Sequence, residues 1–245
     1  MIGLSVKEWA AWAPGLVDQS AWSAWAQAPW LPMGEETPAL SEVPAMQRRR
    51  IERLGRMAIQ TAFWCQRAHA GGVPMVFASR HGDVARSMEL LEALVAGESP
   101  SPTTFGLSVH NAIAALYSIL RGERGNYVAT AGGMATVETA FIEAAALLAD
   151  GAPEVLLVVY DAPLPAVYGS FADEPDAGFA WCWRLVGTDP ALPTLRLAWG
   201  AEEGEGEGVP ASLPHGLDVM RFLLARETQM AWRGDGVRWQ WRRDA

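Results

Sequence analysis

Hydrophobic residues alternate, along the middle of the chain, between short continuous runs and stretches with helical spacing. Runs of strand length occur at residues 73–78, 125–130 and 155–160. Stretches with apolar residues three and four positions apart occur at residues 46–70, 83–95, 108–120 and 135–148. Strands that alternate with helices are typical of parallel βαβ units, whose sheet is covered on both faces. The pattern therefore predicts an α/β fold.

The first two of these helices carry more specific signals. The spacing over 46–70 places one apolar face along the helix, made of Ile51, Leu54, Met57, Ala58 and Thr61. Asp83 stands directly before the apolar positions of the second helix. Its side chain can accept a hydrogen bond from a free N–H of the first turn, so we expect it to be the N-cap.

The two ends of the chain have other patterns. In the first forty residues, Trp9 with Trp12 and Trp22 with Trp25 are spaced to share a helix face, and their rings either close over the core or contribute to a partner surface. After residue 165 we expect strands at 179–186 and 194–199 that form an antiparallel hairpin, then a flexible acidic loop at 202–208, a helix at 217–232, and a strand with Trp239 and Trp241 on one side.

Composition narrows the class of protein. A chain of 245 residues that is 50% hydrophobic can bury a large core, and we expect one domain over residues 1–245. The formal net charge of −9 argues against a nucleic-acid partner. Two cysteines supply neither a disulfide framework nor metal-ligand spacing, which favours a reducing cytoplasm and no bound metal or cofactor. The sequence contains no signal-peptide pattern and no apolar run of about 20 residues, so we expect a soluble cytoplasmic protein without a membrane span.

A strand that turns sharply into a helix at residues 125–140 is the strongest candidate for a functional site. Such an elbow presents its apex residue at a helix N-terminus, where free N–H groups and the helix dipole lower a thiol pKa and stabilise an oxyanion. The turn holds Ala131, Gly132 and Gly133. Glycine can adopt a strained turn but has no side chain to attack a substrate. The elbow is therefore of a type that carries a nucleophile, and here it carries none.

Other nucleophiles remain open as an alternative. Ser79 stands near His81 and Asp83, the three residue types of a hydrolase triad, although triads are normally assembled from separate loops. Cys65 falls inside an amphipathic helix and Cys182 between two tryptophans of a strand, and packing is the expected role of both. A stand-alone acyltransferase or thioesterase would have to use Ser79 or one of these thiols.

The segment from Ser101 to Asn111 together with the elbow resembles the N-terminal half of β-ketoacyl synthases. Phe105, the helix start Val109-His110-Asn111-Ala112 and the turn Thr130-Ala131-Gly132 follow one another as in that family. The family has cysteine where this chain has Gly132, and two histidines in its C-terminal half. Of His69, His81, His110 and His215, only His215 falls late enough, and its surroundings do not match the family's histidine motifs. The resemblance implies a thiolase-like fold with a truncated C-terminal half and no condensing activity.

Within that family, the blocks at residues 47–58, 77–83, 101–111 and 155–165 are similar to the small chain length factors of aryl polyene and xanthomonadin-type pigment clusters. They cover about residues 45–165. The resemblance implies a heterodimer with a full-length β-ketoacyl synthase that elongates an acyl chain on an acyl carrier protein. Chain length factors of aromatic polyketide systems carry glutamine at the cysteine position, so a role for that glutamine does not transfer to this chain.

The same resemblance points to residues near the boundary between subunits. It implies that Phe105, His110, Leu116 and Met134 approach the acyl tunnel or the partner. Physical chemistry independently favours a partner, because a sheet reduced to half a thiolase fold leaves an edge strand and an apolar face uncovered.

Overall fold

A computed structural model describes residues 1–66, 71–201, 211–234 and 236–244. The described residues form one eight-stranded sheet in the order β3-β2-β4-β5-β1-β6-β8-β7. The strands are β1 (Ile2–Trp12), β2 (Met75–Ala78), β3 (Tyr127–Thr130), β4 (Val155–Asp161), β5 (Phe179–Val186), β6 (Thr194–Ala201), β7 (Gln229–Gly234) and β8 (Val237–Arg243).

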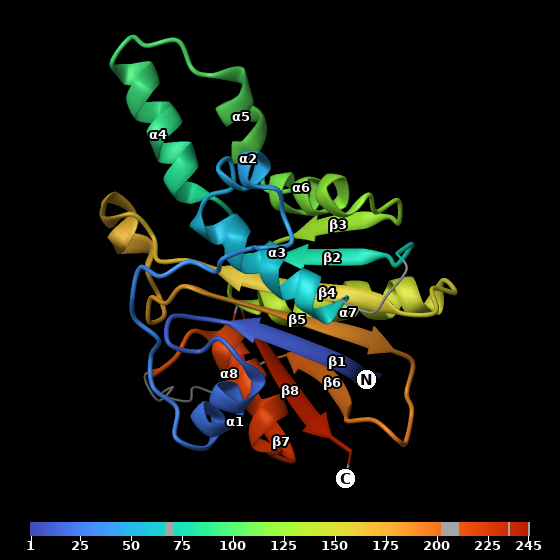
Figure 1. Cartoon of the computed structure of the whole chain (residues 1–245). Coiled ribbons are helices and arrows are strands. Elements are labelled where there is room, and N and C mark those ends of the chain that lie inside the picture. The colour runs from blue at the N-terminus through green and yellow to red at the C-terminus, as the bar shows by residue number, and fades with distance from the viewer. Residues whose placement is uncertain (67–70, 202–210, 235, 245) are drawn as a thin grey trace.

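Helices cover the sheet and connect its strands (Figure 1). They are α1 (Gln19–Gln27), α2 (Ala45–Arg48), α3 (Arg53–Cys65), α4 (Val84–Val95), α5 (Pro102–Ser108), α6 (Ala112–Arg121), α7 (Thr136–Ala149) and α8 (His215–Ala225), with 3-10 turns η1 (Gly133–Ala135) and η2 (Ala166–Phe171). Among these residues, no helix is long and apolar enough to cross a membrane.

The parallel part of the sheet matches the α/β prediction. Strand β2 pairs in parallel with both β3 and β4, and helices lie between these strands in the chain. The other strand pairs are antiparallel. The predicted hairpin of β5 with β6 is wrong, because β1 lies between them and pairs with both.

The predicted shared helix face of Trp9 and Trp12 is wrong. Trp9 and Trp12 lie in a strand rather than on a helix, and residues three apart in a strand point to opposite faces. Accordingly, Trp9 packs against one core and Trp12 is buried in the other. Trp22 and Trp25 do share the buried side of a helix, α1, with ring centroids 5.1 Å apart.

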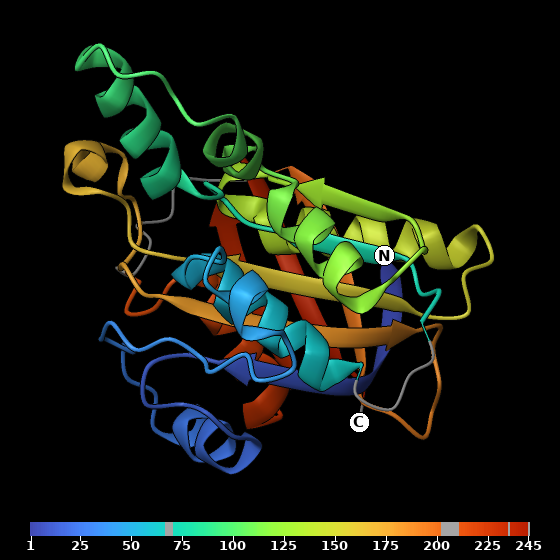
Figure 2. The same cartoon turned by 45° about the horizontal axis from the view of Figure 1, so that its top comes forward.

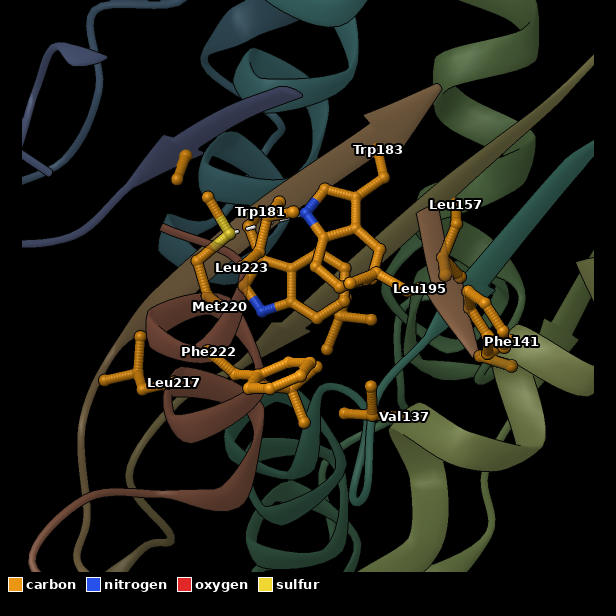
Figure 3. Packing of buried hydrophobic residues seen from close by; sticks show 14 of the residues in the cluster. Val137, Phe141, Leu157, Trp181, Trp183, Leu195, Leu217, Met220, Phe222 and Leu223 are labelled. Atoms are coloured by element: carbon orange, nitrogen blue, oxygen red, sulfur yellow. Dashed lines mark hydrogen bonds between the residues drawn. The ribbon is translucent and has the colours of Figure 1, made fainter. Parts of the chain in front are cut away.

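Two hydrophobic cores lie on the two faces of the sheet, as expected for βαβ units. Helices α1, α7 and α8 lie on the first core, and α3 and α6 cover the second. Figure 3 shows the first core, where the rings of Trp181 and Trp183 stack at 4.3 Å and Trp183 Nε1 donates to Met220 Sδ at 3.4 Å. Cys182, between these tryptophans in β5, points into the second core. Both faces of β5 are therefore buried.

Several helices begin or end at residues other than those predicted. The described part of the helix predicted at 46–70 forms two helices, α2 and α3, and residues 67–70 lie outside the described residues. Arg56 stabilises the turn between the two helices through bonds to the carbonyls of Ile51 and Arg48. The apolar face of α3 is buried as predicted. Asp83 is the N-cap of α4, where its side chain accepts from Arg86 N. The helix predicted at 108–120 begins at Ala112, because residues 102–108 form the separate helix α5.

At the C-terminal end, the predicted helix at 217–232 ends at Ala225, and Trp232 lies in β7. Trp239 and Trp241 share the buried side of β8, as predicted. The acidic segment 202–208 lies outside the described residues.

Helices α4 and α5 form an arm that projects from the body (Figures 1 and 2). Helix α4 packs mainly against α5, and its one buried residue is Arg86. Its apolar side chains Leu91, Leu94 and Val95 are exposed.

Candidate functional site

The elbow between β3 and α7 is a closed turn. Thr136 Oγ1 accepts a hydrogen bond from the backbone N–H of Gly132 at 3.0 Å and donates to the carbonyl of Gly133 at 2.8 Å. Gly133 has a φ of 56°, a left-handed conformation that favours glycine. The N–H at the apex, the group that would stabilise an oxyanion in an active elbow, is therefore bonded within the turn.

The apex also lacks space for a nucleophilic side chain. A Cβ atom at Gly132 would meet Thr139 Oγ1 and would lie 3.0 Å from Thr139 Cβ and 3.2 Å from the carbonyl of Ala135. A cysteine or serine at this position would require the first turn of α7 to move.

Ser79 is part of the structure's framework. Its side chain is fully buried, donates to Asp161 Oδ1 at 2.8 Å and accepts from Gly82 N at 2.8 Å. Asp83 is engaged elsewhere, since it caps α4 and bonds Arg86 Nε at 3.1 Å. The sequence cluster Ser79, His81 and Asp83 is therefore not arranged as a triad.

Asp161 lies half-buried at the end of β4. Burial raises the pKa of Asp161 to about 7, against the opposing effect of the Ser79 hydroxyl. Desolvation and the Arg80 charge lower the pKa of His81. Arg80 Nη1 in turn lies 2.9 Å from both Asp173 and Glu174. This cluster was not predicted from the sequence, because its members come from three separate segments, at residues 79–81, 161 and 173–174.

Both cysteines are buried, as predicted. Cys65 and Cys182 are free thiols without exposed surface, and Cys65 Sγ lies 3.6 Å from the carbonyl of Cys182. Burial raises the pKa of the Cys182 thiol, which disfavours its reactive thiolate.

The four residues expected near a tunnel or partner occupy different environments. His110 Nε2 donates to the carbonyl of Ser79 at 3.0 Å, and Ser79 N donates to the carbonyl of Thr130 at the end of β3. His110 is thus linked to the elbow strand. Phe105, on α5, is 64% exposed. Leu116 packs against the second core from α6, and Met134 is half-buried in η1.

A buried polar cluster stands on α7, six residues after the apex. Glu138 has no exposed surface, and its Oε1 accepts from His215 Nε2 at 2.8 Å, Trp232 Nε1 at 2.7 Å and Trp241 Nε1 at 2.7 Å. Burial opposes ionisation of Glu138, but His215 and the two indole N–H groups outweigh it and lower the pKa of Glu138. The sequence signal was a charged residue on the apolar side of α7, next to Val137 and Phe141.

His215, the first residue of α8, is therefore bonded to Glu138 of α7. This contact does not point the His215 side chain toward the elbow. His69 lies outside the described residues. No group of three or more His, Cys, Asp or Glu side chains in the described part of the chain could hold a metal ion.

The family model for the β-ketoacyl synthase N-terminal domain matches residues 22–242. The chain belongs to this family. A search of curated proteins found no match.

Solved structures with the same fold include ketosynthases and their partners. One is a ketosynthase (ApeO) in complex with its chain length factor (ApeC) from Xenorhabdus doucetiae, with 26% identity and a TM-score of 0.85 over 99% of this chain and 100% of the other. The ishigamide ketosynthase/chain length factor has 15% identity and a TM-score of 0.65 over 82% of this chain and 68% of the other. A type II polyketide synthase acyl carrier protein in complex with its ketosynthase, AntDE:AntF, has 14% identity and a TM-score of 0.60 over 82% and 69%. The fold is thus thiolase-like, as the resemblance implied.

Proposed function

We propose that this protein is a non-catalytic chain length factor that pairs with an active β-ketoacyl synthase in aryl polyene-type chain elongation. The observation that carries the proposal is the elbow. Its apex is Gly132, its N–H is bonded to Thr136, and Thr139 occupies the space that a nucleophile would need.

The similarity of this chain to solved structures supports the same role. The alignment with the chain from the ApeO–ApeC complex covers nearly all of both chains, so this protein and the matched chain have similar lengths. The structures reported above include two ketosynthase and chain length factor pairs.

The open edge of the sheet supports a partner on the side of β3. Strand β3 is the first strand of the described sheet, and helix α6 lies beside it. Apolar side chains are exposed on this side, including Ile119 on α6 at 73% and Tyr127 on β3 at 36%. An unpaired edge next to exposed apolar residues favours pairing with another sheet.

The arm made by α4 and α5 also favours a partner subunit. Helix α4 is twelve residues long, a length that is marginal for an isolated helix in water. None of its apolar side chains is fully buried, and Leu91, Leu94 and Val95 are exposed. A ketosynthase subunit that covers the arm and the β3 edge would supply the missing burial.

Phe105, His110, Leu116 and Met134 remain our candidates for the acyl tunnel or the subunit boundary. Phe105 best fits a role at the boundary, because it is exposed on the arm. His110 links the start of α6 to the elbow strand through Ser79. In this proposal the acyl carrier protein delivers its acyl group to the ketosynthase, and this subunit shapes the tunnel.

The alternative, an acyltransferase or thioesterase in its own right, has less support. Ser79, Cys65 and Cys182 are all fully buried, and Ser79 already has two hydrogen-bond partners. A nucleophile without exposed surface cannot reach an acyl carrier protein.

Intact-mass analysis combined with co-expression tests the proposal. After incubation with an acyl-CoA or an acylated carrier protein, the purified chain should carry no covalent acyl group, while its ketosynthase should carry one. The two proteins should also elute together in size-exclusion chromatography. A stoichiometric acyl group on Ser79, Cys65 or Cys182 would establish the enzymatic alternative.

A further inference from the structure

A hollow of about 370 Å³ lies where α8 ends and β8 finishes, away from the elbow. Arg226, Thr228, Arg243 and Asp244 line it, together with the loop that precedes β6. Arg226 follows the last residue of α8, and Arg243 is the last residue of β8. Two arginines from different elements therefore border the same hollow.

The acidic side chains near these arginines are already engaged. Both oxygens of Asp244 bond to Arg196, with Nε at 2.8 and 3.0 Å and Nη2 at 2.7 Å. Glu227 Oε1 bonds to Arg221 Nη1 at 2.6 Å. The positive charges of Arg226 and Arg243 are thus left without a carboxylate among the described residues, in a chain whose formal net charge is −9.

Arg243 is held in place by the helix. Its Nη1 donates to the carbonyl of Leu223, in the last turn of α8, at 2.6 Å. A guanidinium has five N–H donors in a fixed plane, so this bond orients the group and leaves further donors available. Burial and the neighbouring Arg226 charge lower the pKa of Arg243, which means that the two cations are close enough to repel each other.

Arg226 also has an unfavourable backbone conformation. Its φ of 58° is left-handed, at a helix end where glycine is the usual residue. Backbone strain of this kind persists where the surrounding structure holds the residue, and it is common at ligand sites. Glycine at this position would make the folded chain more stable than arginine does, and Arg226 lines the same hollow as Arg243.

We propose that this hollow binds a phosphate group between Arg226 and Arg243. A phosphate would neutralise both guanidinium groups, which bind phosphate oxygens through charge-assisted, paired hydrogen bonds. Thr228 lines the same hollow, and a threonine hydroxyl can donate a further hydrogen bond. The phosphate is either free or part of a small phosphomonoester.

The test is isothermal titration calorimetry with the full chain at constant ionic strength, with inorganic phosphate and AMP as probes and sodium chloride as the blank. The key variant is Arg226→Gly, which removes one charge and relieves the left-handed strain, so it should fold at least as well as the wild type. Arg50→Gln is the charge-matched control, because Arg50 is exposed on the distant turn between α2 and α3.

We expect the wild type and Arg50→Gln to bind phosphate equally, and Arg226→Gly to bind about tenfold more weakly or not at all. Binding of AMP at least as tight as that of inorganic phosphate would identify a phosphomonoester, and preference for inorganic phosphate would identify the free ion. The proposal is wrong if the wild type responds to neither probe. It is equally wrong if Arg226→Gly binds like the wild type, because Arg226 would then serve only the helix end.

Discussion

The carboxylate of Glu138 lies 2.8 Å from Nε2 of His215, a residue 77 positions further along the chain. The same oxygen accepts the indole N–H groups of Trp232 and Trp241. One buried carboxylate therefore connects α7, the helix that begins at the elbow, to α8, β7 and β8. This contact attaches the C-terminal elements to the βαβ part of the fold.

We predict that Glu138→Gln lowers the free energy of unfolding by about 2–3 kcal/mol, because a buried ionic acceptor of three donors is replaced by a neutral amide. Urea unfolding at pH 7 measures this loss. Glu143→Gln, on the same helix, is the control and should change stability little.

The stability difference between the wild type and Glu138→Gln should depend on pH, because the pKa of Glu138 is lowered. A lowered folded-state pKa gives stability that is present above the ordinary value of 4.5 and is lost as the pH falls through the folded-state pKa. The gap between wild type and Glu138→Gln should therefore narrow below about pH 4.5. A gap that stays constant down to acid unfolding would contradict the assignment.

Asp161 should show the opposite pH dependence. Its pKa is raised from 3.8 to about 7, chiefly by burial, so the folded state binds more protons than the unfolded state between these values. Stability then falls as the pH rises from about 4 to 7. Asp161→Asn keeps an acceptor for Ser79 and cannot ionise, and we expect it to be more stable than the wild type at pH 8 by about 1–3 kcal/mol.

Thermal or urea unfolding of both proteins at pH 5, 6, 7 and 8 tests this directly. The advantage of Asp161→Asn should grow with pH and level off above about pH 7. Parallel curves for the two proteins would mean that Asp161 does not titrate in this range.

Gly132→Cys restores the family's residue at the apex without restoring function. Its side chain would press on Thr139, so we expect a loss of about 1–3 kcal/mol in stability. Adding Thr139→Ala should recover most of this loss. Neither variant should condense acyl groups, because the Gly132 N–H is bonded to Thr136. Unfolding curves and a condensation assay check both points, and a condensing double variant would show that these two substitutions alone are enough to restore activity.

The order of strands and helices in the βαβ region could be predicted from the sequence because it depends on local patterns. Runs such as Val155–Asp161 and the Asp83 cap are visible without knowledge of their partners. Strand β1 could not be predicted in this way. Its Trp9 and Trp12 match helical spacing, and only pairing with residues of β5 and β6 that are at least 168 positions away makes this segment a strand.

Some features of the candidate site can also be seen in the sequence, and others need the structure. The absence of a nucleophile at Gly132 is a residue identity, so the sequence is enough to see it. The Thr136 and Thr139 contacts that close the elbow need coordinates, although both residues are near in sequence. The Glu138 cluster depends on partners 77, 94 and 103 positions away, and spacing carries no information about such contacts.

Residues that limit the acyl tunnel should alter product length. Each buried methylene contributes about 0.8 kcal/mol, close to fourfold in binding, so removal of one blocking side chain can admit one or two further extension units. We predict longer products for at least one of Phe105→Ala, Leu116→Ala, Met134→Ala and His110→Gly in a reconstituted system with ketosynthase and carrier protein. Mass spectrometry of the products checks this. Wild-type lengths from all four intact heterodimers would reduce the role of this subunit to stabilising its partner.

Co-expression with the ketosynthase, followed by size-exclusion chromatography with light scattering, measures whether the two proteins form a complex. Ile119→Asp places a charge on the exposed side of α6 beside β3, and Val17→Asp places the same charge before α1, where the side chain is 55% exposed. Neither change should unfold the free chain, because both side chains are exposed. We expect a 1:1 complex for the wild type and Val17→Asp, and separate proteins for Ile119→Asp. If the wild-type chain stays apart from the ketosynthase at micromolar concentration, this protein is not a ketosynthase partner.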